Sequence, residues 1–315
     1  MRNRKIEQIS VISGKGGTGK TSYVAAFACI ESDLVLADCD VDAANLHLVT
    51  GQRQKYIEIE AFRSGFKASA DPDACIGCAT CLNVCRFHAV EMTGITASAT
   101  IDKARIIDLS CEGCGCCADE CPKGAISLTE NTAGELFVSP SRFGTLVHAR
   151  LNPGEGTSGK LVTRVREKAK TIAGQRGSGL VLIDGCPGIG CPVIASISGT
   201  DAALIVTEPT VSGFNDFIRA ADLCSHFNIP TYTVINKCDI NFKVTEMIRE
   251  HSRSKRIEVL GSVPFDPVFT RAQTEGLTVM EYAKNSSTLN LEEIWSNLLN
   301  KVRNFDDDIP EAAAK

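Results

Sequence analysis

Residues 14–21 of the chain read Gly14-Lys15-Gly16-Gly17-Thr18-Gly19-Lys20-Thr21. This stretch matches the phosphate-binding pattern G-x-x-x-x-G-K-[ST]. Apolar residues at 6–13 predict a buried strand before it, and a helix is predicted after it over about 19–31. The glycines let backbone N–H groups turn toward phosphate oxygens, and the start of a helix adds a positive potential. We therefore expect all eight residues to form part of a nucleotide site.

Two residues of this loop have chemical roles of their own. Lys20 is expected to reach the β- and γ-phosphates, and the Thr21 hydroxyl is expected to bind Mg²⁺. A glycine-rich turn without a ligand is the plainer alternative, which the flanking strand and helix disfavour. A second stretch with the same glycine–lysine spacing, residues 154–160, has Leu161 in the hydroxyl position. Because it lacks a magnesium ligand, we expect it only to lead into a helix.

Beyond the loop, apolar runs of strand length alternate with helical stripes. The strand-like runs lie at 34–37, 146–151, 180–183, 202–207, 231–235 and 257–263, and helices are predicted near 161–172, 212–227, 242–251, 267–275 and 289–303. This alternation predicts an α/β fold with a doubly wound, mostly parallel sheet. Between about 56 and 135 the pattern changes to short pieces and cysteine runs, which indicates an insertion.

The predicted organisation is therefore a discontinuous sheet domain at 1–58 and 136–303, with an inserted domain at 59–135. The tail at 304–315 is acidic, and we expect it to be disordered. A net charge of -5 argues against nucleic acid as a partner. The longest uncharged stretch, 185–200, is too short to span a membrane, and no signal peptide is recognised. We expect a cytoplasmic protein, with the apolar residues of the last helix in its core.

Cysteine is unusually frequent: the chain has 15, and nine of them fall between 75 and 121. A reducing compartment keeps thiols free, so this clustering indicates metal or cluster binding rather than disulfides. Two runs share the spacing C-x₂-C-x₂-C-x₃-C. The first is Cys75, Cys78, Cys81 and Cys85, and the second is Cys111, Cys114, Cys117 and Cys121.

This doubled spacing is that of two-cluster ferredoxins, in which the fourth cysteine of each run binds the other run's cluster. The insert is thus predicted to be a bacterial-ferredoxin-like α+β domain with two [4Fe–4S] clusters. One would be held by Cys75, Cys78, Cys81 and Cys121, and the other by Cys85, Cys111, Cys114 and Cys117. Two zinc sites, or one of each kind, are the alternatives; zinc ribbons need no third cysteine in each run. Cys116 is surplus and is expected to be a free thiol.

Phosphoryl transfer also requires a metal bridge and a positioned water. Lys15 and Lys20 supply cations, and Asp184 is expected to join Thr21 in holding Mg²⁺ through water. Asp40 is expected to orient the attacking water, with Asp38 as a helper behind it. The alternative is that Asp38 and Asp42 merely cap loops.

Lys15, directly after the first glycine, makes the loop resemble the deviant Walker A motif of the MinD/ParA/Mrp ATPases, to which the nitrogenase iron protein is related. Residues 38–45 resemble the switch I segment of that group, and 184–188 resemble its Walker B and switch II. Residues 236–239 and 263–266 resemble its adenine-holding segments. The resemblance implies a nucleotide-sandwich homodimer in which Lys15 reaches the partner's phosphates, and adenine contacts from Asn236, Pro264 and Asp266.

The whole chain resembles MinD-superfamily ATPases with an inserted ferredoxin domain. This implies an ATPase, using ATP/ADP and Mg²⁺, whose switching controls electron transfer through two clusters to an unidentified redox partner. The alternatives are an Mrp-type iron–sulfur carrier and a MinD/ParA-like spatial organiser. No C-x-x-C pair follows Cys191 as the carrier would require, and the acidic balance disfavours the organiser. Cys186 and Cys191 are expected to be small packed residues.

Overall fold

The computed structural model describes residues 5–31, 34–51, 56–93, 102–283 and 286–305. The chain forms two compact units, each with its own hydrophobic core. The first, here called the sheet unit, comprises residues 1–59, 136–150 and 158–315. The second, the cysteine unit, comprises residues 60–135 and 151–157. The acidic stretch 306–315 lies outside the described residues.

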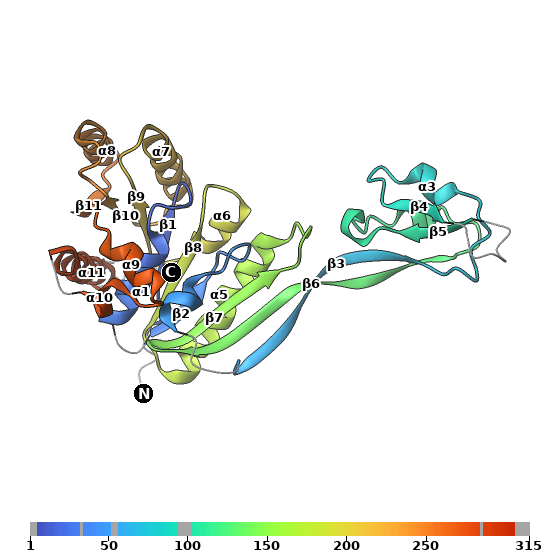
Figure 1. The fold of residues 1–315 in the computed structure, drawn as a ribbon, viewed down its shortest axis with the longest axis horizontal. Helices are drawn as coiled ribbons and strands as arrows, with labels where there is room; N and C mark the ends of the chain where they lie inside the picture. The colour runs from blue at the N-terminus through green and yellow to red at the C-terminus, as the bar shows by residue number, and fades with distance from the viewer. Residues whose placement is uncertain (1–4, 32–33, 52–55, 94–101, 284–285, 306–315) are drawn as a thin grey trace, which may run out of the picture. The chain divides into compact units, whose positions relative to one another are not determined.

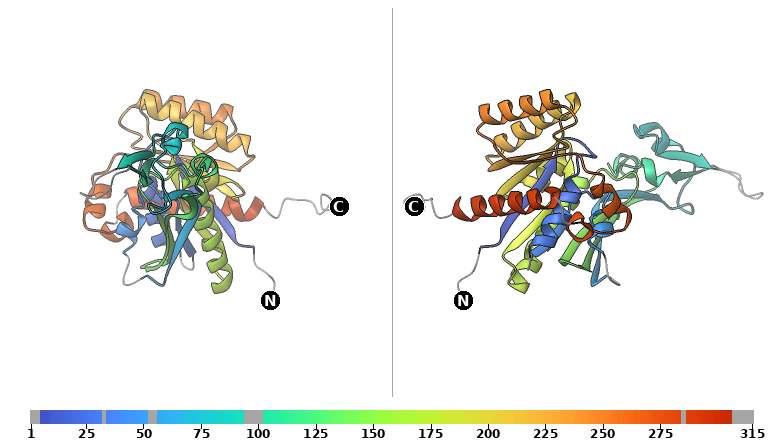
Figure 2. Two further views of the ribbon diagram at one scale, coloured as in Figure 1. Left: turned by 90° about the vertical axis from the view of Figure 1, so that its right-hand side faces the viewer. Right: turned by 60° about the vertical axis from the view of Figure 1, so that its left-hand side comes forward.

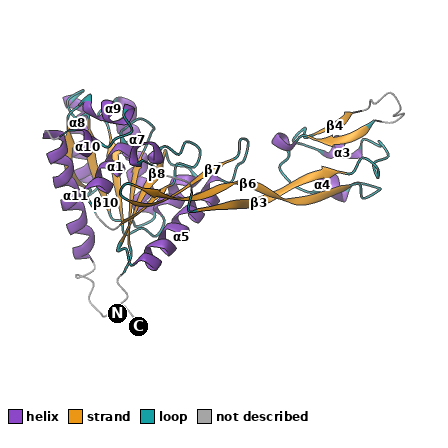
Figure 3. Ribbon diagram, turned by 60° about the horizontal axis from the view of Figure 1, so that its bottom comes forward, coloured by secondary structure: helices purple, strands orange, loops and turns teal. Residues whose placement is uncertain are grey.

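The sheet unit is built on a parallel sheet with helices on both faces (Figures 1 and 3). The pairings from β11 through β10, β9, β1, β8 and β2 to β7 are all parallel. In that order the strands are β11 (Glu258–Val263), β10 (Thr231–Asn236), β9 (Ala202–Thr207), β1 (Glu7–Ser13), β8 (Leu180–Pro187), β2 (Leu34–Asp38) and β7 (Gly144–Leu151). An α/β fold with a mostly parallel sheet is thus confirmed.

Two layers of helices cover this sheet (Figure 2). On one face α1 packs with α10 and α11, and on the other α5 packs with α6, and α7 with α8. The helices are α1 (Lys20–Ile30), α2 (Leu46–Thr50), α5 (Ser158–Arg176), α6 (Cys191–Ile197), α7 (Val211–His226), α8 (Phe242–Ser254), α9 (Val268–Thr274), α10 (Val279–Tyr282) and α11 (Ser286–Phe305). The predicted core residues of α11, including Trp295 and Leu298, are buried, whereas Leu289 at its start is exposed. Among the described helices, none has the length and apolar character needed to cross a membrane.

Two long strands, β3 (Glu58–Ala70) and β6 (Ile126–Ser141), extend the sheet beyond β7 and continue into the cysteine unit. The sequence analysis expected only short pieces here, which is wrong for these segments. Most of β3 is exposed or half-buried, as is the first half of β6. Without a buried face there is no apolar alternation to reveal a strand.

The cysteine unit adds a two-stranded antiparallel sheet and short helical turns around the cysteine runs. Its elements are β4 (Val90–Thr93), β5 (Lys103–Ile106), the 3₁₀ turn at Asp108–Ser110, α3 (Thr80–Val84) and α4 (Cys116–Asp119). Its small core consists of alanine, valine and isoleucine packed against cysteines. So small an apolar core suggests that this unit draws stability from something other than hydrophobic burial.

Candidate functional site

A hollow of about 900 Å³ lies where the carboxyl ends of β1, β2, β8 and β10 meet. Ligand sites of open α/β sheets lie at this edge of the sheet. The predicted residues that line it are Gly16, Gly17, Thr18, Gly19, Lys20, Thr21, Asp40 and Asn236. Six predicted residues are not among its lining residues: Gly14, Lys15, Asp38, Asp184, Pro264 and Asp266.

Lys20 and Asp184 form a buried ion pair at the base of this hollow. Lys20 Nζ lies 2.7 Å from Asp184 Oδ1, and both side chains are almost wholly buried. Burial alone lowers the pKa of Lys20, but the charge and hydrogen bond of Asp184 raise it above its usual value. The second carboxylate oxygen of Asp184 is buried without a hydrogen-bond partner among the described atoms. An unsatisfied buried carboxylate oxygen is costly, and a metal-bound water would satisfy it.

Asp38 lies beside Asp184, because β2 and β8 pair these two residues in register. Its Oδ1 accepts a hydrogen bond from the Asp40 N–H at 3.1 Å, and its Oδ2 accepts one from the Leu46 N–H at 3.0 Å. Burial, together with the negative charge of Asp184, raises the pKa of Asp38 to about 7. Asp38 thus holds both ends of the loop that carries Asp40 by hydrogen bonds.

Asp40 is half-buried and lines the hollow. The pKa of Asp40 is raised above its usual value, chiefly by burial. Lys20 opposes this increase and Asp184 adds to it. Its neighbour Asp42 is exposed. The arrangement puts one carboxylate of this loop, Asp40, against the space where phosphates would lie.

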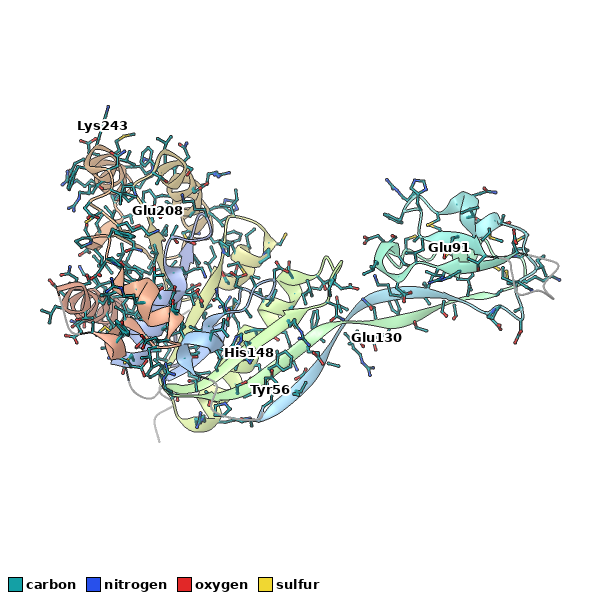
Figure 4. All side chains as sticks on the ribbon, viewed as in Figure 1. Tyr56, Glu91, Glu130, His148, Glu208 and Lys243 are labelled. Atoms are coloured by element: carbon teal, nitrogen blue, oxygen red, sulfur yellow. The ribbon has the colours of Figure 1, made fainter. Side chains whose placement is uncertain are left out.

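Lys15 is held within its own chain. Its Nζ lies 2.7 Å from Glu208 Oε1 and donates to the hydroxyls of Thr210 and Ser212 at 3.1 and 3.2 Å. Glu208 also accepts from Lys237 Nζ at 2.8 Å, so one carboxylate serves two lysines. Burial would raise the pKa of Glu208, but the two lysines lower it below its usual value. Sequence reasoning missed Glu208 (labelled in Figure 4), whose only signal is that it directly follows a strand.

Asn236 braces the phosphate-binding loop. Its Nδ2 donates to the Thr18 carbonyl at 2.7 Å, and its Oδ1 accepts from the Tyr23 hydroxyl at 3.2 Å. Asp266 accepts from the Val268 N–H and the Ser287 hydroxyl instead of facing the hollow. In this part of the chain the hollow is lined by α9 instead. The α9 residues that line it are Phe269, Thr270 and Gln273, which sequence reasoning did not identify.

The cysteine unit contains two hollows of similar size, about 370 and 350 Å³. The first cysteine hollow is lined by Cys75, Cys78, Cys81 and Cys121. The second cysteine hollow is lined by Cys85, Cys111, Cys114 and Cys117, and also by Cys116, which lies outside the repeated C-x₂-C-x₂-C-x₃-C spacing. Each hollow therefore takes three cysteines from one run and one from the other. Within the described residues, no three His, Cys, Asp or Glu side chains could hold a single metal ion.

The two halves of this unit repeat at an offset of 36 residues, as Cys111 follows Cys75. The backbone repeats too, since three corresponding pairs have positive φ angles. These are Gly77 and Gly113, Ala79 and Gly115, and His88 and Gly124. Backbone N–H groups point at ligand sulfurs in both halves, from Ala89 to Cys85 Sγ and from Ala125 to Cys121 Sγ, each at 3.3 Å.

The remaining cysteines differ in exposure. Cys186 is buried and its thiol donates to the Cys39 carbonyl at 2.7 Å. Cys191 is exposed at the start of α6, so the expectation of a packed residue is wrong there. It lies in a loop-to-helix junction whose glycines and prolines leave little side chain to cover it. Cys116 is exposed and lines the second cysteine hollow, so the structure places a fifth thiol there beside Cys114 and Cys117.

The family described as "CobQ/CobB/MinD/ParA nucleotide binding domain" matches residues 9–279. The chain belongs to this family. The match covers the phosphate-binding loop, both switch segments and the inserted unit, so the MinD/ParA P-loop ATPase superfamily predicted from the sequence is confirmed.

This MinD/ParA-family chain is also similar to a curated relative and to solved MinD structures. "Uncharacterized protein MJ0578" of Methanocaldococcus jannaschii is 34% identical over 264 residues, which is 83% of this chain and 85% of the relative. The MinD cell division protein of Aquifex aeolicus has a TM-score of 0.54 at 16% identity, covering 93% of this chain and 97% of that one. The cell division ATPase MinD of Pyrococcus furiosus has a TM-score of 0.52 at 16% identity, covering 94% and 99%. At these identities the structural likeness establishes a MinD-like fold.

Proposed function

We propose that this chain is a nucleotide-switched ATPase of the MinD/ParA type, which binds ATP with Mg²⁺ and hydrolyses it. The observation that carries the proposal is the buried Lys20–Asp184 pair with its unsatisfied carboxylate oxygen. A lysine and a carboxylate at the end of a phosphate-binding loop are the groups that hold a phosphate and a magnesium ion. Similarity to MinD and ParA proteins supports the MinD/ParA-like spatial organiser, named above as an alternative, better than it supports an electron-transfer protein.

Each residue has a distinct part in this proposal. Thr21 and Asp184 would hold Mg²⁺, which neutralises charge on the phosphates when bound. Lys20 leaves its ion pair to contact the phosphates, and Asp40 orients the attacking water. Asp38 keeps the Asp40 loop in position through the two hydrogen bonds that it accepts from backbone N–H groups. Lys15 contacts the phosphates of a second copy of the chain.

Three substitutions test these roles. Lys20→Ala should weaken ATP binding, because its cation acts in both ground and transition states. Asp40→Ala should keep ATP and accumulate a closed dimer, because it removes a group that acts mainly in the transition state. Lys15→Ala should bind ATP as a monomer without turnover. Size-exclusion chromatography with MgATP, beside phosphate release, reports all three. Wild-type hydrolysis by monomeric Lys15→Ala would disprove the sandwich dimer.

We also propose that the two cysteine hollows hold [4Fe–4S] clusters. What supports this is the donor set: four thiols line the first hollow and five line the second, four of which have the ferredoxin spacing, and N–H groups are directed at cysteine sulfurs. A [4Fe–4S] cluster contains eight core atoms and therefore keeps its four cysteines apart. A single zinc ion instead binds all four thiolates at about 2.3 Å. The thiolate charge would be offset by iron and by the N–H donors.

The metal content of anaerobically purified protein tests this second proposal. We expect about eight irons and eight acid-labile sulfides per chain. Cys75→Ser should lose the cluster of its hollow and destabilise the other, because the two runs exchange ligands. Cys116 lines the second hollow but lies outside the repeated spacing, so Cys116→Ser should keep full iron if Cys117 is the ligand. Stoichiometric zinc with little iron would exclude the proposal.

With both sites occupied, we propose that nucleotide switching controls electron transfer to a partner protein. The comparisons give this coupling no support, and it rests on the two sites sharing one chain. EPR spectra of the reduced protein with and without MgATP test it, since coupling requires a nucleotide-dependent change. An unchanged spectrum together with nucleotide-dependent binding to liposomes or DNA would favour the spatial organiser, and loss of iron to a chelator would favour the Mrp-type carrier.

A further inference from the structure

The two cysteine hollows have equivalent ligands but differ in the charges around them. Because the halves of the cysteine unit correspond at an offset of 36 residues, each charged position can be compared with its counterpart. The comparison bears on the reduction potentials of the two clusters, and so this inference rests on the cluster-binding function proposed above. A positive charge close to a cluster favours its reduced state, which carries one more negative charge.

A lysine in each half contacts the cysteine run of the other half. Lys103 Nζ donates to the Cys75 carbonyl, beside the first hollow. Its counterpart Lys67 donates to the Cys111 carbonyl at 2.8 Å, beside the second hollow, and to the Asp108 carbonyl at 3.0 Å. Judged by these contacts alone, the two hollows would feel the same positive charge.

A carboxylate cancels the charge of only one of these lysines. Lys67 Nζ lies 3.3 Å from Glu155 Oε1, and their side chains are only 18% and 13% exposed. The other oxygen of Glu155 accepts from Asn131 Nδ2 at 2.9 Å, which fixes the carboxylate in place. Within the described part of the chain, Lys103 forms no ion pair with a carboxylate. An uncompensated ammonium therefore lies beside the first hollow and a neutral pair beside the second.

The lining residues add to this difference. Lys123 lines the first hollow, and its counterpart in the second is the uncharged Phe87. Glu112 lines the second hollow, and its counterpart in the first is the uncharged Ile76. Both departures from the repeat thus make the first hollow more positive than the second.

Exposed carboxylates also lie in sequence beside the first hollow, since Asp71 and Asp73 precede Cys75 and Glu120 precedes Cys121. The difference therefore rests mainly on the half-buried Lys103.

Arg86 follows Cys85 of the second hollow, but it is exposed and its guanidinium lies over the Phe87 ring. Salt screens such an exposed charge more than it screens Lys103, which is half-buried. Asp119, also exposed, lies near Gly115 on the side of the second hollow and adds negative charge there.

We propose that the cluster in the first hollow (Cys75, Cys78, Cys81 and Cys121) has the higher reduction potential of the two. A single electron held by the cysteine unit then resides in the first hollow, and the second hollow is reduced only when a second electron is added. Lys103 and Lys123 favour the reduced state of the first cluster. Glu155 keeps Lys67 from doing the same for the second.

An EPR-monitored redox titration of the full chain, purified anaerobically, tests this order. Lys103→Met should lower the higher of the two midpoint potentials and leave the lower one in place. The matched control is the double variant Lys67→Met with Glu155→Gln, which removes a neutral pair at the corresponding position and should move neither potential. Glu155→Gln alone exposes the charge of Lys67 and should raise the lower potential.

The inference is overturned if Lys103→Met shifts the lower potential, or if it shifts neither while full iron is retained. Should Lys103→Met lose iron, Lys123→Gln provides the same measurement from an exposed position, and it too must lower the higher potential. Wild-type protein without iron would instead refute cluster binding itself. Iron content thus separates failure of the proposed function from failure of this inference.

Discussion

Lys15 and Glu208 form an ion pair at 2.7 Å within one chain, although they are far apart in sequence. The pair exists because β9, which ends just before Glu208, lies next to β1, which leads into the phosphate-binding loop. If Lys15 contacts the phosphates of a second chain, as proposed above, it must first leave this ion pair within its own chain. Breaking this pair becomes part of the free energy of dimerisation.

Glu208→Gln should therefore promote ATP-dependent dimerisation. A partly exposed ion pair is worth about 1 kcal/mol, and a homodimer breaks two of them, one in each chain, so half-dimerisation should require a roughly thirtyfold lower protein concentration. Analytical ultracentrifugation with MgATP measures this. Asp222→Asn, which removes an exposed pair with Lys255, is the control and should change nothing. A Glu208→Gln protein that no longer dimerises would mean that Glu208 positions Lys15 for use.

Asn236→Ala should weaken ATP and GTP binding by the same factor, roughly five- to tenfold, because it removes the buried hydrogen bond to the Thr18 carbonyl. Tyr23→Phe, which removes only the bond to Asn236 Oδ1, should have a smaller effect. Titration with fluorescent analogues of both nucleotides gives the two affinities. A loss confined to ATP would show that Asn236 reads the adenine, as the sequence analysis expected.

Gly113→Ala should disrupt the second cysteine hollow. Gly113 has a φ of +62°, and a Cβ there would overlap the carbonyl oxygen of Phe66. Gly124 has a φ of +58° and open space where a Cβ would lie, so Gly124→Ala carries the backbone strain without the overlap. We expect Gly113→Ala to lose at least half of its iron and Gly124→Ala to lose little. Equal losses would contradict the steric explanation.

His148→Phe should make the sheet unit less sensitive to acid. His148 stacks on Phe137 with ring centroids 5.1 Å apart and lies close to Tyr56 (Figure 4). Burial, followed by the neighbouring His47, lowers its pKa from 6.5 to about 4. Between those values the folded protein binds fewer protons than the unfolded chain, so stability falls as pH falls through this window.

By pH 4.5 this effect should cost the native protein on the order of 2 to 3 kcal/mol relative to pH 7. Urea unfolding followed by the fluorescence of Trp295, the single tryptophan, measures it. His148→Phe should reduce the difference between the two pH values by that amount. A variant with the wild-type pH dependence would show that His148 is protonated normally.

The phosphate-binding loop could be predicted because its residues are contiguous and its pattern is local. Asp38, Asp40 and Asp184 could be proposed because they follow predicted strands, whose carboxyl ends meet at one edge. Glu208 and the α9 side chains could not, because they reach the site only through the order of strands and the packing of helices. The two sets of cysteines were predicted from the doubled spacing together with the exchange of the fourth cysteine that two-cluster ferredoxins show.

The internal repeat of the cysteine unit bears on how this unit arose. Each half supplies three cysteines to one hollow and the fourth to the other, and each lysine contacts the opposite half. A single half is therefore incomplete, whereas two identical copies related by a twofold axis would complete both hollows at once. The repeat has the form of a symmetric pair of ancestral peptides fused into one chain. Once the halves are fused, each can change independently, as the different residues Ile76 and Glu112 at equivalent positions show. Identical copies of one peptide cannot differ in this way.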